Sequence, residues 1–271
     1  MIRAMFFDLD GTLLDSGKRI RPSSVEALER AKARGIRLYV ATARSPRLED
    51  KLNWPARQKA LFSGGIYSNG GVVRVGEELT YALIPEAAVR AAVEEAARFP
   101  EVHLSLHMPD NGHAFNFPVH EGMMDGWVIR PEHIFPLDDA AVARTLKVLM
   151  FYNDLFVDQH PLPAALLESL QRRTAGLAQV YLTDGGCTIM MASARAGKFR
   201  AIDGLRQELG LDWDEVAVFG DDLNDVEMLS ACPNGVAMGN ATPQAKAAAA
   251  YVTGSNDADG IAQAVDWLLA R

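Results

Sequence analysis

The sequence predicts a doubly wound parallel α/β sheet that is interrupted by a separate α+β module. Strand-like and helix-like segments alternate over residues 1–82, the alternation is lost over residues 83–184, and it resumes over residues 185–271. A β–α–β order implies parallel strands joined by right-handed crossovers. We therefore expect a core domain built from residues 1–82 and 185–271, with residues 83–184 inserted as a cap domain.

The first segment shows the alternation most clearly. Residues 2–7 (IRAMFF) read as a short buried strand and residues 36–42 (IRLYVAT) as a second one. Apolar residues at helical spacing predict a helix between them, with Ser23 or Ser24 as its N-cap. A third strand is expected near residues 65–69, followed by a Gly-Gly turn and the segment VVRV.

The central segment has a different texture. Residues 85–99 form a strongly amphipathic helix candidate, and the strand candidates HLSLHM and KVLMFY alternate with helix candidates near residues 138–146 and 162–174. After residue 185 the first rhythm returns, with a helix that opens at Lys198, strand candidates VAVFGDD, NGVAMG and AYVT, and a last helix that begins near Asp257 or Asp259.

Composition and charge exclude several classes of protein. The net charge of −8 argues against a broad nucleic-acid surface, which requires a concentrated basic face. No stretch approaches the roughly 20 apolar residues of a membrane span, and the N-terminus lacks a secretion signal. The two cysteines, Cys187 and Cys232, have neither disulfide-framework nor metal-ligand spacing. We expect a cytoplasmic protein, a monomer or a homodimer.

Polar side chains gather where three predicted strands end. Ligands of an open parallel sheet bind beyond the carboxyl ends of its strands, so these side chains are expected to converge. Lys198, at the start of a helix just before the third of these strands, is expected to join them. The three groups are Asp8, Asp10 and Thr12; Thr42, Arg44 and Ser45; and Asp221, Asp222, Asn224 and Asp225.

Close carboxylates without a nearby histidine or cysteine favour a hard cation such as Mg²⁺. A carboxylate beside Mg²⁺ and a lysine stays ionised, as a nucleophile that forms an acyl phosphate must. A second carboxyl two residues later can give a proton to the leaving group and later take one from water. The spacing of Asp8 and Asp10 fits this division of roles.

Other motifs that contain acidic residues or glycines fit less well. An EF-hand loop that starts at Asp8 requires glycine at its sixth position and glutamate at its twelfth, where this chain has Leu13 and Arg19. The sequence has no G-x-x-x-x-G-K-[ST] phosphate loop, and GGIYSNGG is not a G-x-G-x-x-G fingerprint.

Four segments together resemble the haloacid dehalogenase (HAD) superfamily. They are FFDLDGTLLDS, VATAR, a lysine that precedes a helix, and FGDDLNDVEMLSACPNGVAMGNA. Their order and spacing are similar to the Cof-type (type IIB-like) branch, in which a large α/β cap is inserted between the second and third motifs. The resemblance covers the core segments and implies a Rossmann-like core and a Mg²⁺-dependent phosphatase.

The resemblance also implies roles for individual residues of the core. Asp8 is then the nucleophile and a Mg²⁺ ligand, and Asp10 the general acid and base, with its backbone carbonyl on the metal. Thr42 binds the phosphoryl group, and Lys198 balances the charge of nucleophile and phosphate.

The last motif implies a third metal ligand, Asp221. Asn224 and Asp225 complete the acidic site by direct contacts, by water-mediated contacts or by anchoring Lys198. Two departures from the family pattern are Phe199 directly after the lysine, where a small residue is common, and Asp222, which we regard as a neighbour of the site.

The cap is expected to close over the strand ends and to contact the leaving group. His103 and His107 share one face of a predicted strand, which allows a metal site there, but we favour packed or solvated histidines. Six candidates for substrate contact follow from position and polarity: Arg44, Arg47, His113, Asn116, His120 and Arg130.

The leading hypothesis is a phosphomonoester hydrolase that works through an aspartyl-phosphate on small phosphorylated metabolites, such as sugar phosphates. One alternative is a phosphotransferase of the phosphomannomutase kind, which returns the phosphoryl group to a sugar. Another is a non-catalytic phosphometabolite-binding protein, and the intact pair Asp8 and Asp10 argues against it.

Overall fold

The computed structural model describes residues 1–46, 52, 54–127, 129–152 and 160–271. It has two compact units: unit 1, made of Met1–Thr80 and Ala196–Arg271, and unit 2, made of Tyr81–Arg195. None of the helices in the described part of the chain combines the length and apolar character needed to cross a membrane.

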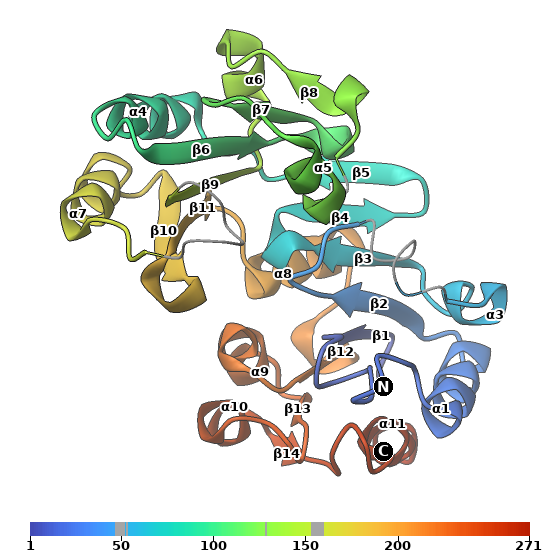
Figure 1. Ribbon diagram of the computed structural model, residues 1–271. Helices are drawn as coiled ribbons and strands as arrows, with labels where there is room; N and C mark the ends of the chain where they lie inside the picture. The colour runs from blue at the N-terminus through green and yellow to red at the C-terminus, as the bar shows by residue number, and fades with distance from the viewer. Residues whose placement is uncertain (47–51, 53, 128, 153–159) are drawn as a thin grey trace. The chain divides into compact units, whose positions relative to one another are not determined.

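Unit 1 is built on an eight-stranded sheet. Its strands are β1 (Ala4–Phe7), β2 (Arg37–Ala41), β3 (Gly64–Tyr67), β4 (Val72–Val75), β5 (Glu78–Tyr81), β12 (Val216–Gly220), β13 (Gly235–Ala237) and β14 (Tyr251–Val252). They are ordered β14-β13-β12-β1-β2-β3-β4-β5 (Figure 1). The pairs from β14 to β3 are all parallel, and β4 runs antiparallel to β3. The predicted doubly wound α/β class is confirmed for this unit.

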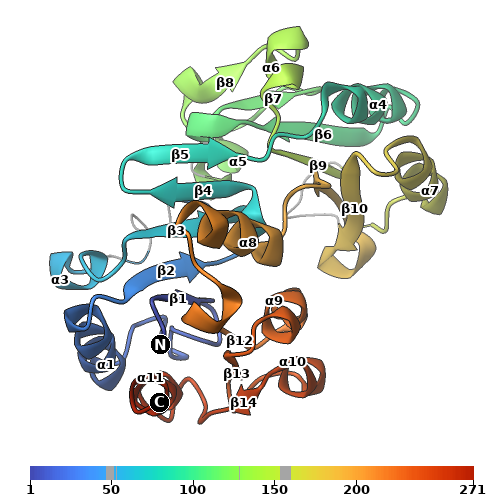
Figure 2. The ribbon, with the colours of Figure 1, turned by 180° about the vertical axis from the view of Figure 1, so that it is seen from behind.

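Helices cover both faces of the parallel part of this sheet. They are α1 (Pro22–Ala33), α3 (Ala56–Lys59), α8 (Lys198–Glu208), α9 (Val226–Ala231), α10 (Pro243–Ala248) and α11 (Gly260–Leu269), with the short 3₁₀ turns η1 (Ser68–Gly70), η5 (Trp213–Glu215) and η6 (Leu223–Asp225). Helices α1 and α11 lie side by side on one face, and α9 and α10 lie together on the other (Figures 1 and 2).

The apolar sequence of β1 places it at the centre of the sheet. All four of its residues are buried, and β12 and β2 flank it on either side. The Phe7 ring stacks on that of Phe219, and the Phe6 ring on that of Tyr39. Because Phe7 is in register with Phe219 of β12 and Val40 of β2, these three strands end at the same edge of the sheet.

Helix α1 does not begin as the sequence predicts. Its N-cap is Arg21, whose side chain makes no capping hydrogen bond, and both Ser23 and Ser24 lie inside the helix. The expectation of a serine cap was wrong because Pro22, with its fixed φ and missing N–H, occupies the first helical position. The Ser23 hydroxyl instead donates to Asp259 at 2.6 Å.

Unit 2 has a sheet of its own. Its strands are β6 (Val102–His107), β7 (His113–Phe115), β8 (Ile134–Phe135), β9 (Lys147–Tyr152), β10 (Ala178–Thr183) and β11 (Thr188–Ser193), in the order β10-β11-β9-β6-β7-β8. Its helices are α4 (Glu86–Ala97), α5 (Glu121–Trp127), α6 (Asp139–Ala143) and α7 (Ala164–Arg173), with the turns η2 (Pro109–Asn111), η3 (Pro131–His133) and η4 (Asp184–Gly186). A core of aliphatic side chains lies between the sheet and helices α4, α6 and α7.

The limits of unit 2 differ from those of the predicted insertion. The sequence predicts limits at residues 83 and 184, whereas unit 2 runs from residue 81 to residue 195. The second limit moves because β11 pairs with β9 and β10 of unit 2. The sequence TIMMAS of β11 carries no signal that assigns it to one sheet or the other.

Candidate active site

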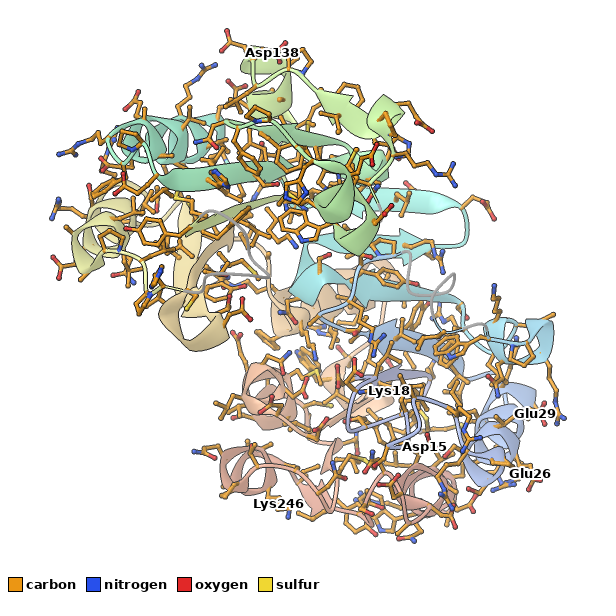
Figure 3. All side chains as sticks on the ribbon, in the orientation of Figure 1. Asp15, Lys18, Glu26, Glu29, Asp138 and Lys246 are labelled. Carbon is orange, nitrogen blue, oxygen red and sulfur yellow. The ribbon has the colours of Figure 1, made fainter. Side chains whose placement is uncertain are left out.

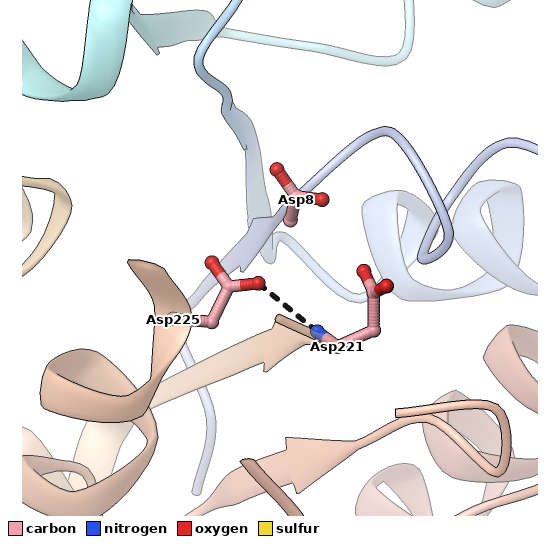
Figure 4. Close-up of side chains that lie close together, drawn as sticks. All are labelled: Asp8, Asp221 and Asp225. Carbon is pink, nitrogen blue, oxygen red and sulfur yellow. Dashed lines mark hydrogen bonds between the residues drawn. The ribbon is translucent and has the colours of Figure 1, made fainter. Parts of the chain in front are cut away.

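Three acidic side chains lie together at the carboxyl edge of the unit 1 sheet. Asp8 follows β1, Asp221 follows β12, and Asp225 ends the turn η6 that comes next (Figure 4). The Asp8 backbone N–H donates to the carbonyl of Phe219 at 2.9 Å, which continues the ladder between the two strands to the site. The predicted convergence of the first and last acidic groups is present in the structure.

Lys198 links two of these acids in a buried ion cluster. Its Nζ donates to Oδ1 of Asp8 and to Oδ1 of Asp225, both at 2.7 Å. The side chains of Lys198, Asp8 and Asp225 are 1%, 9% and 0% exposed, so water contributes little to their solvation. Burial raises the pKa of Asp8 to about 7 against the attraction of Lys198, and the nearby Asp225 raises it further. Burial opposes the charge on Lys198, but the two acids outweigh it and raise the lysine pKa.

Asp225 anchors Lys198, one of the three roles that the sequence leaves open for it. While one oxygen accepts from the lysine, the other accepts from the backbone N–H groups of Asp221 at 3.0 Å and Asp222 at 3.2 Å. The Asp222 side chain turns back to cap η6, in line with its predicted place beside the site. Thr12 donates to Oδ1 of Asp221 at 2.6 Å, and burial raises the Asp221 pKa to about 6.

The same acids fit a hard metal ion. Asp8, Asp221 and Asp225 each offer one carboxylate oxygen, and these atoms lie within 4.8 Å of one another. They are the one such group of metal-ligating side chains in the described residues. Buried carboxylates at this separation repel one another, and an oxygen-preferring cation such as Mg²⁺ relieves the repulsion. Because both oxygens of Asp225 are already hydrogen-bonded, Asp8 and Asp221 are the better side-chain ligands.

Asp10 belongs to a second ion pair system. Its carboxylate accepts from Arg44 Nε and Arg44 Nη2, both at 2.6 Å, and from Lys18 Nζ at 2.7 Å. Lys18 lies in the loop that follows β1 (Figure 3). The hydrogen bonds from Arg44 hold the Asp10 pKa at about 2, below its ordinary value of 3.8. Arg44, predicted as a substrate residue, therefore contacts the predicted acid and base directly.

We expect the Arg44→Met substitution to raise the pKa of Asp10 towards 3.8, because it removes the two-pronged hydrogen bond. A carboxyl ¹³C chemical-shift titration reports the midpoint. The lowered pKa of Asp10 also makes stability depend on pH. The ion pairs of Asp10 stabilise the fold above about pH 4, and this contribution is lost as the pH falls towards 2. Arg57 makes an equally forked pair with Glu29 on the surface, so Arg57→Met is the matched control and must leave the Asp10 midpoint unchanged.

Glycine is required at residue 11, between the two acidic systems. Gly11 has a φ of +81°, and a Cβ atom added there would overlap the carboxylate of Asp221. This residue lets the chain turn past Asp221 directly after Asp10.

The loop after β1 is fastened to two loops, one between β13 and α10 and the other between β14 and α11. Asn240 Nδ2 donates to the carbonyl of Gly11 at 2.8 Å, and Asn256 Nδ2 donates to the carbonyl of Leu14 at 2.9 Å. The two asparagines are themselves joined, because the Asn256 N–H donates to Asn240 Oδ1 at 3.0 Å. Beyond them Asp257 accepts from both the N–H and the hydroxyl of Ser16. None of these contacts is predicted from the sequence, although Asn240 lies within the segment FGDDLNDVEMLSACPNGVAMGNA.

Thr42 and Asn224 occupy the rest of the edge. Thr42 is buried directly after β2, and its Oγ1 accepts from the Arg44 N–H at 3.1 Å. The exposed Asn224 donates to Oδ1 of Asn69 at 3.2 Å. Asn69 comes shortly after β3 and was not predicted. Its φ of 51° is left-handed, and an asparagine followed by two glycines is the sequence signal typical of such a turn.

Two of the predicted substrate residues have backbone partners within unit 2. The Asn116 carboxamide accepts from the N–H of Leu104 at 2.7 Å and donates to the carbonyl of Val102 at 3.1 Å, so it continues the pairing of β7 with β6 beyond the end of β7. His120 Nδ1 accepts from the N–H of Met123 at 3.2 Å and caps the first turn of α5.

The other predicted substrate residues have different positions. Arg47 lies outside the described residues. Arg130 is exposed just before η3, and His113 is buried on β7 with its ring 4.7 Å from that of His107. The His103 ring stacks on that of Phe117 at 3.8 Å, as expected for a packed histidine.

Comparisons with known proteins agree with this geometry. A family model described as haloacid dehalogenase-like hydrolase matches residues 5–265. Pyridoxal phosphate phosphatase YbhA of Escherichia coli is 29% identical over 96% of this chain and 96% of its own length. Phosphatase YwpJ of Bacillus subtilis is 26% identical over 99% of this chain and 100% of its own. The solved HAD subclass IIB sugar phosphatase BT4131 has a TM-score of 0.73 and 26% identity, with 99% of this chain and 100% of that one covered.

Proposed function

We propose that this chain is a Mg²⁺-dependent phosphomonoester hydrolase that works through an aspartyl-phosphate. The chain belongs to the haloacid dehalogenase-like hydrolase family and is a phosphatase of its Cof-type branch. The observation that carries the proposal is the buried cluster in which Lys198 joins Asp8 and Asp225 beside Asp221. Lys198 lowers the pKa of Asp8 against the effect of burial and orients its carboxylate, and both effects favour nucleophilic attack on phosphorus.

In this proposal each residue has one task. Asp8 and Asp221, together with the backbone carbonyl of Asp10, would hold Mg²⁺, and the ion would supply positive charge to the phosphoryl oxygens. Asp8 attacks phosphorus, and the Thr42 hydroxyl binds a phosphoryl oxygen. Asp10 protonates the leaving oxygen and later accepts a proton from the attacking water.

Asp10 requires its local partners to change before it can act as an acid. In the structure Arg44 and Lys18 hold it ionised, with a pKa of about 2. A phosphoryl group competes for the same cations, because Arg and Lys bind phosphate oxygens as readily as carboxylates. We propose that the substrate draws Arg44 away from Asp10 and so raises the Asp10 pKa.

Substrates are proposed to be small phosphorylated metabolites, with sugar phosphates first. The likeness to a sugar phosphatase supports that choice, and the likeness to YbhA adds pyridoxal 5′-phosphate to the panel. The test measures kcat/KM for inorganic phosphate release over such a panel with Mg²⁺, with and without EDTA. Release that EDTA abolishes supports the proposal, and release that EDTA leaves unchanged contradicts it. Formation of a bisphosphate or a transferred phosphate ester in place of inorganic phosphate supports the phosphotransferase alternative.

The Asn240→Ala substitution is expected to lower kcat about 10- to 100-fold with little change in KM, because a displacement near 1 Å of the loop that carries Asp10 has an effect of this size. Steady-state kinetics on the best substrate separate the two constants. Asn234 is the matched control, because its amide also donates to backbone carbonyls, at Asp214 and at Val216, the first residue of β12. Equal kinetic losses in Asn234→Ala and Asn240→Ala would contradict a positioning role.

A further inference from the structure

One face of the unit 2 sheet carries three basic side chains in a row. His113 of β7 is in register with His107 of β6, which is in register with Lys147 of β9. Their neighbours Leu106 and Val148 belong to the aliphatic core, so the basic residues point to the opposite face of the sheet. We call His113, His107 and Lys147 the histidine–lysine row.

Two members of the row, Lys147 and His107, and the neighbouring Ser105 lack the partners that buried polar groups normally have. The Lys147 side chain is half-buried, yet it makes no hydrogen bond or ion pair with any residue that the structure describes. The His107 Nε2 and the Ser105 hydroxyl, two residues away on the same face, are also buried without a hydrogen-bond partner in the described chain. Burial lowers the pKa of both Lys147 and His107. Such groups are costly to bury unless something pairs with them.

Aromatic rings surround the row. The Trp127 ring, at the end of α5, lies 5.4 Å from His107 and 5.7 Å from Phe151. Phe115 stacks on His113 at 5.9 Å. These rings lower the local dielectric constant and therefore strengthen any ion pair formed beside them. They also provide flat apolar surface next to the basic groups.

A second metal site does not fit this chemistry. Two histidines are common metal ligands, but the Lys147 ammonium, directly opposite His107, repels a cation. The row includes no carboxylate, and the acidic group of unit 1 is the one metal-ligating group among the described residues. Each of the three residue types can instead donate hydrogen bonds.

We infer that the histidine–lysine row binds an oxyanion, a carboxylate or a phosphate, carried by a ring or another apolar body that lies against Trp127 and Phe115. Lys147 supplies the positive charge, and the Ser105 hydroxyl and the His107 N–H supply further donors. The oxyanion can be a substituent of the substrate or part of a separate metabolite.

The first experiment titrates the metal-free protein with benzoate, a flat carboxylate, by calorimetry and by the ring signals of the histidines. We expect saturable binding that shifts the His107 signal, assigned by its loss in His107→Phe. Lys147→Met is expected to weaken binding at least tenfold, and Lys147→Arg to retain it. Arg172→Met removes one charge from the exposed surface of α7 and serves as the matched control.

A stability measurement separates a ligand-binding lysine from a structural one. Because partial burial disfavours the charge of Lys147, which has no partner among the described residues, Lys147→Met is expected to raise the melting temperature by about 2 °C or more. A lysine that supports the fold through contacts would lower it. If Lys147→Met fails to fold, the lysine is structural, and His107→Phe then decides whether benzoate binds at the row.

A kinetic comparison distinguishes the two sources of the oxyanion, and this arm alone rests on the proposed phosphatase activity. If the substrate carries it, Lys147→Met raises KM at least tenfold for 4-carboxyphenyl phosphate and leaves that for phenyl phosphate unchanged. If a separate metabolite carries it, added benzoate changes the rates of the wild type on both esters and has no effect on Lys147→Met. Benzoate binding that is equal in the wild type and in Lys147→Met, or absent from the wild type, overturns the inference whether or not the protein hydrolyses either ester.

Discussion

The Asp8→Asn variant is expected to lose kcat by about 10⁴-fold or more and to gain stability in the metal-free state. Asparagine cannot form the aspartyl-phosphate, and removal of a covalent nucleophile has effects of this size in other hydrolases. The stability gain follows from charge, because Asp8 and Asp225 share a single lysine and their cluster carries a net charge of −1. The substitution makes the cluster neutral while Lys198 keeps its bond to Asp225.

The stability gained by Asp8→Asn should increase as the pH rises. The folded-state pKa of Asp8, about 7, lies above its ordinary value of 3.8, so ionisation of Asp8 costs stability as the pH rises between these values. The difference in free energy of unfolding between Asp8→Asn and the wild type should therefore grow from about pH 4 to pH 7. Urea unfolding in EDTA at several pH values measures it. Asp266→Asn, on the surface of α11, is the control. A variant that keeps wild-type turnover with an intact fold would rule out Asp8 as the nucleophile.

The Lys198→Met variant is expected to lose both activity and stability. It leaves two buried carboxylates, Asp8 and Asp225, without their counter-ion, and removal of one partner from a buried pair costs about 3–5 kcal/mol. Turnover is expected to fall because Asp8 then retains its proton and loses its orientation. Urea unfolding and steady-state kinetics measure the two effects, with Lys246→Met as the control for loss of a lysine near the end of a helix.

The double variant Asp8→Asn/Lys198→Met provides a sharper test of the same cluster. Without Asp8, one carboxylate in place of two is left unpaired, so the double variant should be more stable than Lys198→Met alone. The double-mutant cycle gives the coupling energy between the two residues. Stability effects that simply add would show that the 2.7 Å contact does not couple Asp8 to Lys198.

The sequence was most informative where one short motif fixes both a strand and the residue that follows it. A strand as apolar as AMFF must lie inside the sheet, so Asp8 necessarily emerges at its end. The same reasoning applies to Asp221 after the buried β12. Lys198 could be placed beside them because its helix begins at the lysine itself.

Contacts between distant loops could not be predicted in this way. The side chains of Asn240 and Asn256 bond to carbonyls 229 and 242 residues away, and an exposed asparagine in a loop has no periodicity that indicates its partner. The pairing of Arg44 with Asp10 was missed for a related reason, because an arginine after a strand can bind phosphate or carboxylate equally well. The N-cap of α1 was wrong because proline at its first position overrides the serine signal.

The pairing of β1 with both β2 and β12 has a consequence for the synthesis of the protein. β12 begins more than two hundred residues after β1, and the whole of unit 2 is made between them. Domains tend to fold as units while the chain emerges from the ribosome, so unit 2 can fold while β1 still lacks one neighbour. Asp8 then meets Lys198, Asp221 and Asp225 only after nearly the whole chain has left the ribosome. A nascent chain therefore carries the nucleophile long before it can cleave a phosphate ester, and truncated products that end before β12 should be inactive.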